Sequence, residues 1–368
     1  MDHAAFQAAG LYDPQAPHAT ERLQLLEWLA SEGVTIEQMT AALREGVLVG
    51  LAGDLALRPL PHRTLAELAA RVDLPVEQVR ELSIAAGLLP GSPGQAAFTD
   101  ADGEALRAFV GGAALFGADP VKRFARTVGS ALAQIADAGV ALYLSTAEGP
   151  LLASQASELM LAQENLRAIR SLDGVQLALQ ALLRAHIAIA IRRQRLARRQ
   201  QSVDTLHLNV GFIDLVGFTT LSQRMTSAEL AVVIDRFEES AHDIVTARDG
   251  RLVKLIGDEV MFVSVNARAA CDTALALLER FVGDPNVAPR GALAYGPLLF
   301  RGGDYYGPIV NLASRVAELA VPRELLVTES VVAAAQSDAL RFAPAGKRML
   351  KGLAEPVALL TVERQAQR

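Results

Sequence analysis

Two aspartates in the second half of the chain are the residues best suited to chemistry. Asp214 ends an apolar run, and Asp258 stands beside Gly257 between two further apolar runs. Their carboxylates are hard oxygen ligands of the kind that Mg²⁺ or Mn²⁺ takes together with phosphate oxygens. Two such ions, roughly 3.5–4 Å apart, can activate an attacking oxygen and stabilise a leaving one. The alternative is structural, because aspartate is also an ordinary helix cap or turn residue.

The patterns around these aspartates predict the elements that position them. An alternating and then continuously apolar run up to Asp214 is typical of a central strand. Gly257 and Asp258 give a tight-hairpin signal, and Thr226–Glu229 fits a capping box. Strands are expected over 207–214, 251–256, 259–265 and 290–295, and helices over 226–245 and 267–281. This βαββαβ order is a ferredoxin-like core, which brings both aspartates to one end of the sheet.

Two further polar residues share one helix face, and one acidic residue is left out of the candidate site. Asn311 and Arg315 are four positions apart, so both project from one helix face. A guanidinium aimed at charge that develops during a reaction lowers its barrier. Glu259 directly follows Asp258, and because side chains alternate along a strand we expect it to point away from the site.

Three motifs in the second half resemble the signatures of the class III adenylate and guanylate cyclases. They are Phe212–Thr219, Lys254–Glu259 and Asp304–Arg315, and they occur in the family's order. The resemblance covers the chain from about residue 206 to its end. It implies an enzyme that converts ATP to 3′,5′-cyclic AMP and pyrophosphate. In it, Asp214 and Asp258 would hold two divalent metal ions, Mg²⁺ or Mn²⁺.

The resemblance also assigns the residues that recognise the base. Lys254 and Asp304 match the pair that reads the purine: the lysine donates to a ring nitrogen of adenine, and the aspartate accepts from its exocyclic amine. The guanylate cyclase pattern has a glutamate and a small polar residue or cysteine instead. The resemblance therefore implies ATP as the substrate. Without it, Lys254 would be read as an exposed strand lysine.

Ribose and phosphate contacts follow from the same resemblance. Asn311 matches the residue that orients the ribose, and Arg315 matches the one that neutralises charge on the α-phosphate. Arg290 and Lys351 match residues that grip the terminal phosphates, with solvated surface charge as the alternative. The resemblance implies a homodimer with shared sites. One protomer would supply Asp214, Asp258 and Arg290, and the other Lys254, Asp304, Asn311, Arg315 and Lys351.

Composition sets the class of protein. A length of 368 residues is natural for two domains. With 51% apolar residues, 21% charged residues and a net charge of −6, the chain can bury a large core, and nucleic acid is not an expected partner. The single cysteine, Cys271, favours a reducing compartment. The start of the chain has no signal-peptide pattern, and the longest continuous apolar stretches, 111–117 and 187–191, are too short to span a bilayer. We therefore expect a cytoplasmic protein without membrane insertion.

The first half is helical in pattern, so the chain is predicted to be α+β. A helical regulatory domain with a linker helix at its end is expected over 1–200, and the cyclase domain over 201–368. The first half resembles the regulatory domain of a subgroup of actinobacterial cyclases, which implies autoinhibition and sensitivity to pH. His186, in the predicted linker helix, is a candidate titrating group, although it can equally be an ordinary helical histidine. A lipid-like ligand among the apolar helices stays open.

Two segments leave other interpretations open. Residues 64–82 have the look of a helix-turn-helix, but the second helix carries Glu77 and Glu81, which suit phosphate contact poorly. The arginine-rich segment 192–202 is either a contact for an anionic surface or the solvated end of a connecting helix. For the whole chain, the alternatives are a guanylate cyclase, a catalytically inactive nucleotide-binding sensor on the same fold, and a DNA-binding regulator.

Overall fold

A computed structural model describes residues 3–60, 62–89, 91–92, 94–198, 205–284 and 287–365. The chain divides into two compact units, Met1–Leu183 and Arg184–Arg368. The predicted domain boundary between residues 200 and 201 lies outside the described residues. Helix α10 (Glu158–Arg198) begins in the first unit and ends in the second, so its last turns belong to the same unit as the sheet.

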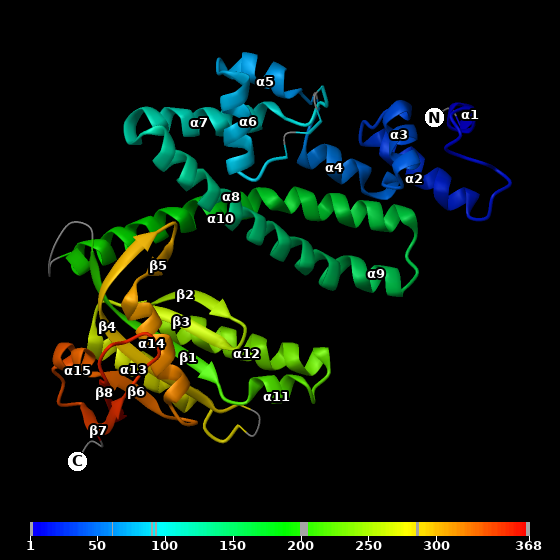
Figure 1. Ribbon diagram of the computed structural model, residues 1–368. Helices are drawn as coiled ribbons and strands as arrows, with labels where there is room; N and C mark the ends of the chain where they lie inside the picture. The colour runs from blue at the N-terminus through cyan, green and yellow to red at the C-terminus, as the bar shows by residue number, and fades with distance from the viewer. Residues whose placement is uncertain are drawn as a thin grey trace. The chain divides into compact units, whose positions relative to one another are not determined.

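The first unit is helical, as predicted (Figure 1). Capping boxes at Thr35, Thr64 and Thr99 fix the starts of three of its helices. Its elements are α1 (His3–Ala8), α2 (Ala19–Ser31), α3 (Ile36–Glu45), η1 (Leu48–Gly50), α4 (Leu51–Leu57), α5 (Leu65–Val72), α6 (Val76–Ala85), α7 (Asp100–Phe116), α8 (Ala118–Tyr143), the π-helical η2 (Leu144–Glu148), α9 (Gly149–Ala153) and the first part of α10.

The segment that has the look of a helix-turn-helix forms α5 and α6. These helices pack with α7 around a common core that includes Leu68, Val79 and Leu106. Glu81, on the second helix, forms an ion pair of 2.5 Å with Lys122 of α8. Helices α5 and α6 are therefore part of a packed helical unit, and an acidic side chain of α6 forms an ion pair with a neighbouring helix.

Two long helical stretches carry a largely exposed apolar surface. Ala118–Ala153 and Glu158–Ala197 are long and apolar enough to cross a membrane by length and composition. The sequence reasoning considered only uninterrupted apolar runs, which are much shorter than these helices. Helices of soluble proteins pass the same test, so the finding is weak support for a membrane span. Absence of membrane insertion stays a prediction.

The second unit is built on a mixed sheet with helices on both faces. The strands run in the order β2-β3-β1-β4-β6-β8-β7, and β5 pairs with β4. Its elements are β1 (Leu206–Leu215), α11 (Phe218–Ser222), α12 (Ser227–Thr246), β2 (Arg251–Ile256), β3 (Glu259–Ser264), α13 (Ala267–Arg280), β4 (Pro289–Arg301), β5 (Asp304–Tyr306), α14 (Pro308–Leu319), β6 (Leu325–Thr328), α15 (Glu329–Ala335), β7 (Leu340–Arg348) and β8 (Val357–Arg364).

The predicted ferredoxin-like core is confirmed. The elements β1, α12, β2, β3, α13 and β4 follow one another along the chain, and their strands lie side by side as β2-β3-β1-β4 with antiparallel pairing. Strand β1 is central and almost wholly buried, which explains its continuous apolar run. The chain as a whole is α+β.

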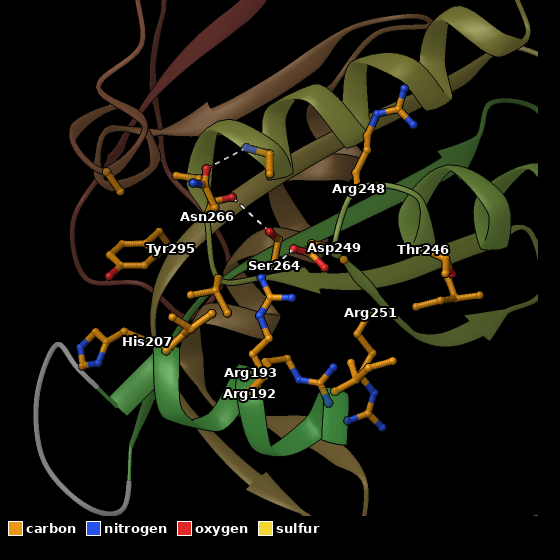
Figure 2. Close-up of a pocket in the computed structure, with 18 of the residues that line it drawn as sticks. Arg192, Arg193, His207, Thr246, Arg248, Asp249, Arg251, Ser264, Asn266 and Tyr295 are labelled. Carbon is orange, nitrogen blue, oxygen red and sulfur yellow. Dashed lines mark hydrogen bonds and ion pairs between the residues drawn. The ribbon is translucent and has the colours of Figure 1, made fainter. Parts of the chain in front are cut away.

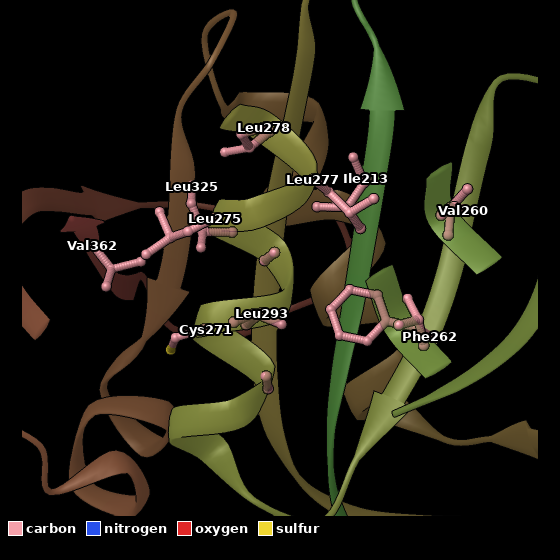
Figure 3. Packing of buried hydrophobic residues seen from close by; sticks show 14 of the residues in the cluster. Ile213, Val260, Phe262, Cys271, Leu275, Leu277, Leu278, Leu293, Leu325 and Val362 are labelled. Carbon is pink, nitrogen blue, oxygen red and sulfur yellow. The ribbon is translucent and has the colours of Figure 1, made fainter. Parts of the chain in front are cut away.

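Alternate residues of β1 face two separate cores. Ile213 packs with Val260 and the residues of α13, as Figure 3 shows. Its neighbour Phe212 packs on the other face with Met261 and the residues of α14. Gly211 is required on the first face, because a Cβ there would lie 2.2 Å from the Phe262 ring. The two faces fix the direction of every side chain at the end of β1.

Candidate active site

Asp214 and Asp258 lie at the same end of the sheet. Asp214 is the penultimate residue of β1, and Asp258 is in the turn between β2 and β3. The amide of Leu215 donates a 3.2 Å hydrogen bond to the Asp258 carbonyl, which ties the turn to the end of the central strand. Burial raises the pKa of Asp258, and the nearby charge of Asp214 acts in the same direction. The two carboxylates therefore share one half-buried region.

Arg290 is engaged by Asp214 and by the end of a helix. The two residues stand opposite each other on β4 and β1, and the Asp214 Oδ2 atom accepts from Arg290 Nε at 3.0 Å and Nη2 at 2.8 Å. Arg290 Nη1 donates to the carbonyls of Glu318, at 2.8 Å, and Ala320, at 3.2 Å. These carbonyls lie at the C-terminal end of α14, where a cation is favoured. The sequence reasoning missed this ion pair.

Glu259 lies closer to the site than the sequence reasoning expected. It stands opposite Asp214 in the pairing of β1 with β3, so the two side chains share a face of the sheet. Burial raises the pKa of Glu259 to about 7, and the charges of Asp214 and Asp258 add to the effect. The expectation from strand alternation was wrong because Asp258 belongs to the turn, where alternation does not apply.

This end of the sheet suits a divalent cation that is shared with a ligand. The carboxyl groups of Asp214, Asp258 and Glu259 lie near one another. The positive charge of Arg290 partly offsets their negative charge. Within the described ranges, no group of three or more His, Cys, Asp and Glu side chains is arranged to enclose a metal ion. Asp214 and Asp258 could hold a metal only as part of a coordination shell, and phosphate oxygens are suitable ligands for the remainder.

A second cluster forms where β2 meets β5. Lys254 Nζ lies 2.7 Å from Asp304 Oδ2, and Asp304 Oδ1 accepts a 2.7 Å hydrogen bond from the Tyr305 amide. Burial alone would raise the pKa of Asp304, but the hydrogen bonds from Lys254 and Tyr305 outweigh it, so this pKa is lowered. Asp304 is therefore an ionised acceptor held in a fixed direction.

Asn311 and Arg315 lie on α14 beside this ion pair. They line a pocket of about 610 Å³ together with Lys254 and Gly352. Arg315 Nη1 donates a hydrogen bond to the Lys351 carbonyl, in the loop between β7 and β8. The pocket volume falls within the range of small-molecule sites, roughly 300–1,000 Å³.

The predicted residues thus fall into two sets. Asp214, Asp258 and Arg290 gather at the end of β1, whereas Lys254, Asp304, Asn311, Arg315 and the Lys351 backbone gather around the pocket. Among the residues that the structure describes, no hydrogen bond or ion pair joins one set to the other.

Comparison with other proteins gives relatives along the full chain. An uncharacterized protein of Mycobacterium tuberculosis is 33% identical over 362 residues, covering 97% of this chain and 93% of its own. A pH-sensitive adenylate cyclase of the same species is 28% identical over 366 residues, covering 95% of this chain and 89% of its own. An adenylate cyclase of Glutamicibacter nicotianae is 42% identical over 134 residues, covering 36% of this chain and 33% of its own. No protein-family model matches the chain.

Solved structures that resemble this chain include nucleotide cyclases. The adenylyl cyclase CyaB from P. aeruginosa aligns with 45% of this chain and 98% of its own, at 23% identity and a TM-score of 0.40. The guanylate cyclase domain of RhGC from Catenaria anguillulae, in complex with GTP, aligns with 45% of this chain and 100% of its own, at 18% identity and a TM-score of 0.41.

Proposed function

Because this chain belongs to the class III nucleotide cyclases, with adenylate cyclases of actinobacteria among its relatives, we propose that it converts ATP to 3′,5′-cyclic AMP and pyrophosphate. The observation that carries this proposal is the 2.7 Å ion pair of Lys254 and Asp304 beside the pocket that Asn311 and Arg315 line. This arrangement supplies a base-reading pair next to groups suited to ribose and phosphate.

The ion pair favours adenine over guanine. Lys254 Nζ is a donor for a ring nitrogen of adenine, and the Asp304 carboxylate is an acceptor for the exocyclic amine. The 2.7 Å contact between them orients each group. A buried donor or acceptor left unpaired costs about 1–3 kcal/mol, so a guanine, which presents the opposite pattern at this edge, is disfavoured.

Arg315 is the proposed group for the transition state. The ribose 3′-hydroxyl attacks the α-phosphorus, a new oxygen–phosphorus bond forms, and the bond to the bridging oxygen breaks as pyrophosphate leaves. Arg315 would neutralise the charge that grows on the α-phosphate, which requires its guanidinium to exchange the Lys351 carbonyl for a phosphate oxygen. Asn311 would hold the ribose, and the Lys351 side chain, with Arg290, would contact the terminal phosphates.

Asp214 and Asp258 are the proposed ligands of two divalent cations. Bound Mg²⁺ or Mn²⁺ would supply the positive charge that activates the attacking hydroxyl and offsets the triphosphate. Burial and mutual repulsion of these carboxylates support the assignment, since a cation relieves both. The proton of the hydroxyl would pass to Asp214 or to solvent.

The active site is proposed to form between two copies of the chain. Each chain carries both sets of residues, and no contact within the described chain joins them, so a symmetric pairing of two catalytic units would create two equivalent sites. Regulation by the helical unit, including autoinhibition and pH sensing, is proposed with support from the pH-sensitive relative. A cytoplasmic location without membrane insertion is likewise a proposal.

The test is product formation by the purified full-length chain. With Mn²⁺, ATP should give cyclic AMP, and GTP should give little cyclic GMP, as measured by chromatography. The Asp258→Ala variant should give neither product. Cyclic GMP as the main product would favour a guanylate cyclase. Nucleotide binding without any product would favour an inactive sensor on the same fold.

A further inference from the structure

The arginine-rich end of α10 faces a large cavity away from the proposed active site. The cavity has a volume of about 1900 Å³ and lies within the second unit. It is between the last turns of α10 and the end of the sheet at which β1 begins (Figure 2). His207, near the start of β1, lines it. Asp214 is seven residues further along the same strand, which is about 23 Å at the usual rise of a strand. The cavity and the carboxylate cluster are therefore separate.

The lining of the cavity has an excess of positive charge. Among the residues that the structure describes, it contains four arginines, Arg192, Arg193, Arg248 and Arg251, against a single acidic residue, Asp249. Of these arginines, Arg192 has a carboxylate partner within the described residues, and that contact is long, at 3.8 Å, and exposed. The chain as a whole has a net charge of −6, so this concentration of positive charge is a local feature.

Two residues that line the cavity each have a buried nitrogen atom that makes no hydrogen bond within the described chain. They are Nε of Arg193 and Nδ1 of His207. Burial lowers the pKa of Arg193 and the positive charge of the neighbouring Arg251 lowers it further, whereas the nearby Tyr305 side chain acts in the opposite direction. A half-buried guanidinium without a carboxylate partner in the described part of the chain is unfavourable, and an anion in the cavity would offset its charge.

Backbone amide groups also favour an anion in the cavity. Helix α13 begins at the cavity, where its capping residue Asn266 and its first-turn residue Ala267 are part of the lining. Amide groups at a helix N-terminus favour negative charge. Arg251 also reaches away from the cavity, because its Nη2 atom donates a 2.7 Å hydrogen bond to the Gly303 carbonyl, next to Asp304.

From these observations we infer that the cavity binds a small molecule that carries phosphate groups. Guanidinium groups pair with phosphate oxygens through two parallel hydrogen bonds, and several of them around one space suit a ligand with more than one negative charge. The site is distinct from the proposed active site, since it shares no lining residue with the pocket of Lys254, Asn311 and Arg315.

Isothermal titration of the full-length protein with pyrophosphate, in the presence of EDTA, tests the inference. We expect binding that Arg193→Gln weakens about tenfold or more, because a charge-assisted contact is lost. Arg248→Gln provides a second variant from the opposite wall. Arg195→Gln is the matched control, because Arg195 lies on the same helix, is exposed and does not line the cavity. It should bind as the wild type does.

The active-site variant Arg315→Ala separates this site from the proposed catalytic one, which pyrophosphate could also occupy as a product. It should keep the binding. Loss of binding in Arg315→Ala, or equal affinity in the wild type and in both cavity variants, would overturn the inference.

A parallel arm uses vesicles of phosphatidylcholine with and without phosphatidic acid, to distinguish a lipid headgroup from a free phosphate compound. Binding to phosphatidic acid that Arg193→Gln removes supports the lipid source. No binding in either arm also refutes the inference.

Discussion

The ammonium group of Lys254 lies 2.7 Å from the carboxylate of Asp304, although 50 positions of sequence separate them. The lysine comes from the edge strand β2, and the aspartate comes from β5, which forms a hairpin with the end of β4. The ion pair therefore depends on the relative position of β2 and this hairpin. It fixes the donor and acceptor that a purine would meet in the adjoining pocket.

Substitution of both residues of this ion pair should change the preferred nucleotide. In the double variant Lys254→Glu and Asp304→Cys, the donor and acceptor pattern for adenine is lost and an acceptor for guanine is introduced. We expect the ratio of GTP to ATP turnover to rise about tenfold or more, given the energies of such hydrogen bonds. The measurement is kcat/KM for both nucleotides. An unchanged ratio would show that these residues do not read the base.

Activity should depend on divalent cations through Asp214 and Asp258. EDTA should abolish cyclic AMP formation, and added Mn²⁺ or Mg²⁺ should restore it in the wild type. Asp258→Asn should remain nearly inactive at any metal concentration, because an amide is a weaker ligand than a carboxylate. Activity of the wild type in EDTA, with trace metals removed, would refute the metal assignment.

Loss of Arg290 should destabilise the end of the sheet. Arg290→Gln leaves Asp214 beside Asp258 and Glu259 without its guanidinium partner. We expect the free energy of unfolding to fall by about 1–3 kcal/mol in a urea titration. Arg341→Gln is the control, since its ion pair with Glu363 is exposed, and it should change stability by less than about 1 kcal/mol. Equal effects of the two variants would contradict this account of Arg290.

Gly211→Ala should strain the core. The added methyl group would lie 2.2 Å from the Phe262 ring and 2.9 Å from the Leu293 side chain, both of which are buried. Overpacking of this kind typically costs about 1–3 kcal/mol, seen as a lower Tm. Gly174→Ala, in the open middle of α10, should leave Tm unchanged or raise it. A Gly211→Ala protein as stable as the wild type would show that the core can relax.

The ferredoxin-like core could be predicted because its signals are local. The expected strand over 251–256 coincides with β2, and the expected helix over 267–281 differs from α13 by one residue. The hydrophobic periodicity and the Gly257–Asp258 turn depend on residues that are close in sequence, so contacts with distant parts of the chain do not alter them. The strands from β5 onward were not predicted. Strands β5 and β6, with three and four residues, are too short to show a period, and Pro344 and Gly346 interrupt the pattern of β7.

The contacts of the site were harder to predict than its residues. The ion pair of Arg290 with Asp214 depends on the register between β1 and β4, which no local pattern records. The position of Glu259 depends on whether Asp258 counts as a strand or a turn residue, a difference of one position that reverses the face. The pocket around Lys254 and Asn311 required three distant segments to meet, and motif resemblance alone suggested it.

Two inactive variants offer the most direct test of an active site shared between chains. Asp258→Ala and Arg315→Ala each remove one half of the proposed site, so each should be nearly inactive alone. After the two variants are mixed and allowed to exchange subunits, half of the dimers should contain one subunit of each variant. One of the two sites in such a dimer should be intact. We predict cyclic AMP formation at about a quarter of the wild-type rate. A mixture that stays as inactive as its components, although exchange is verified, would contradict the account.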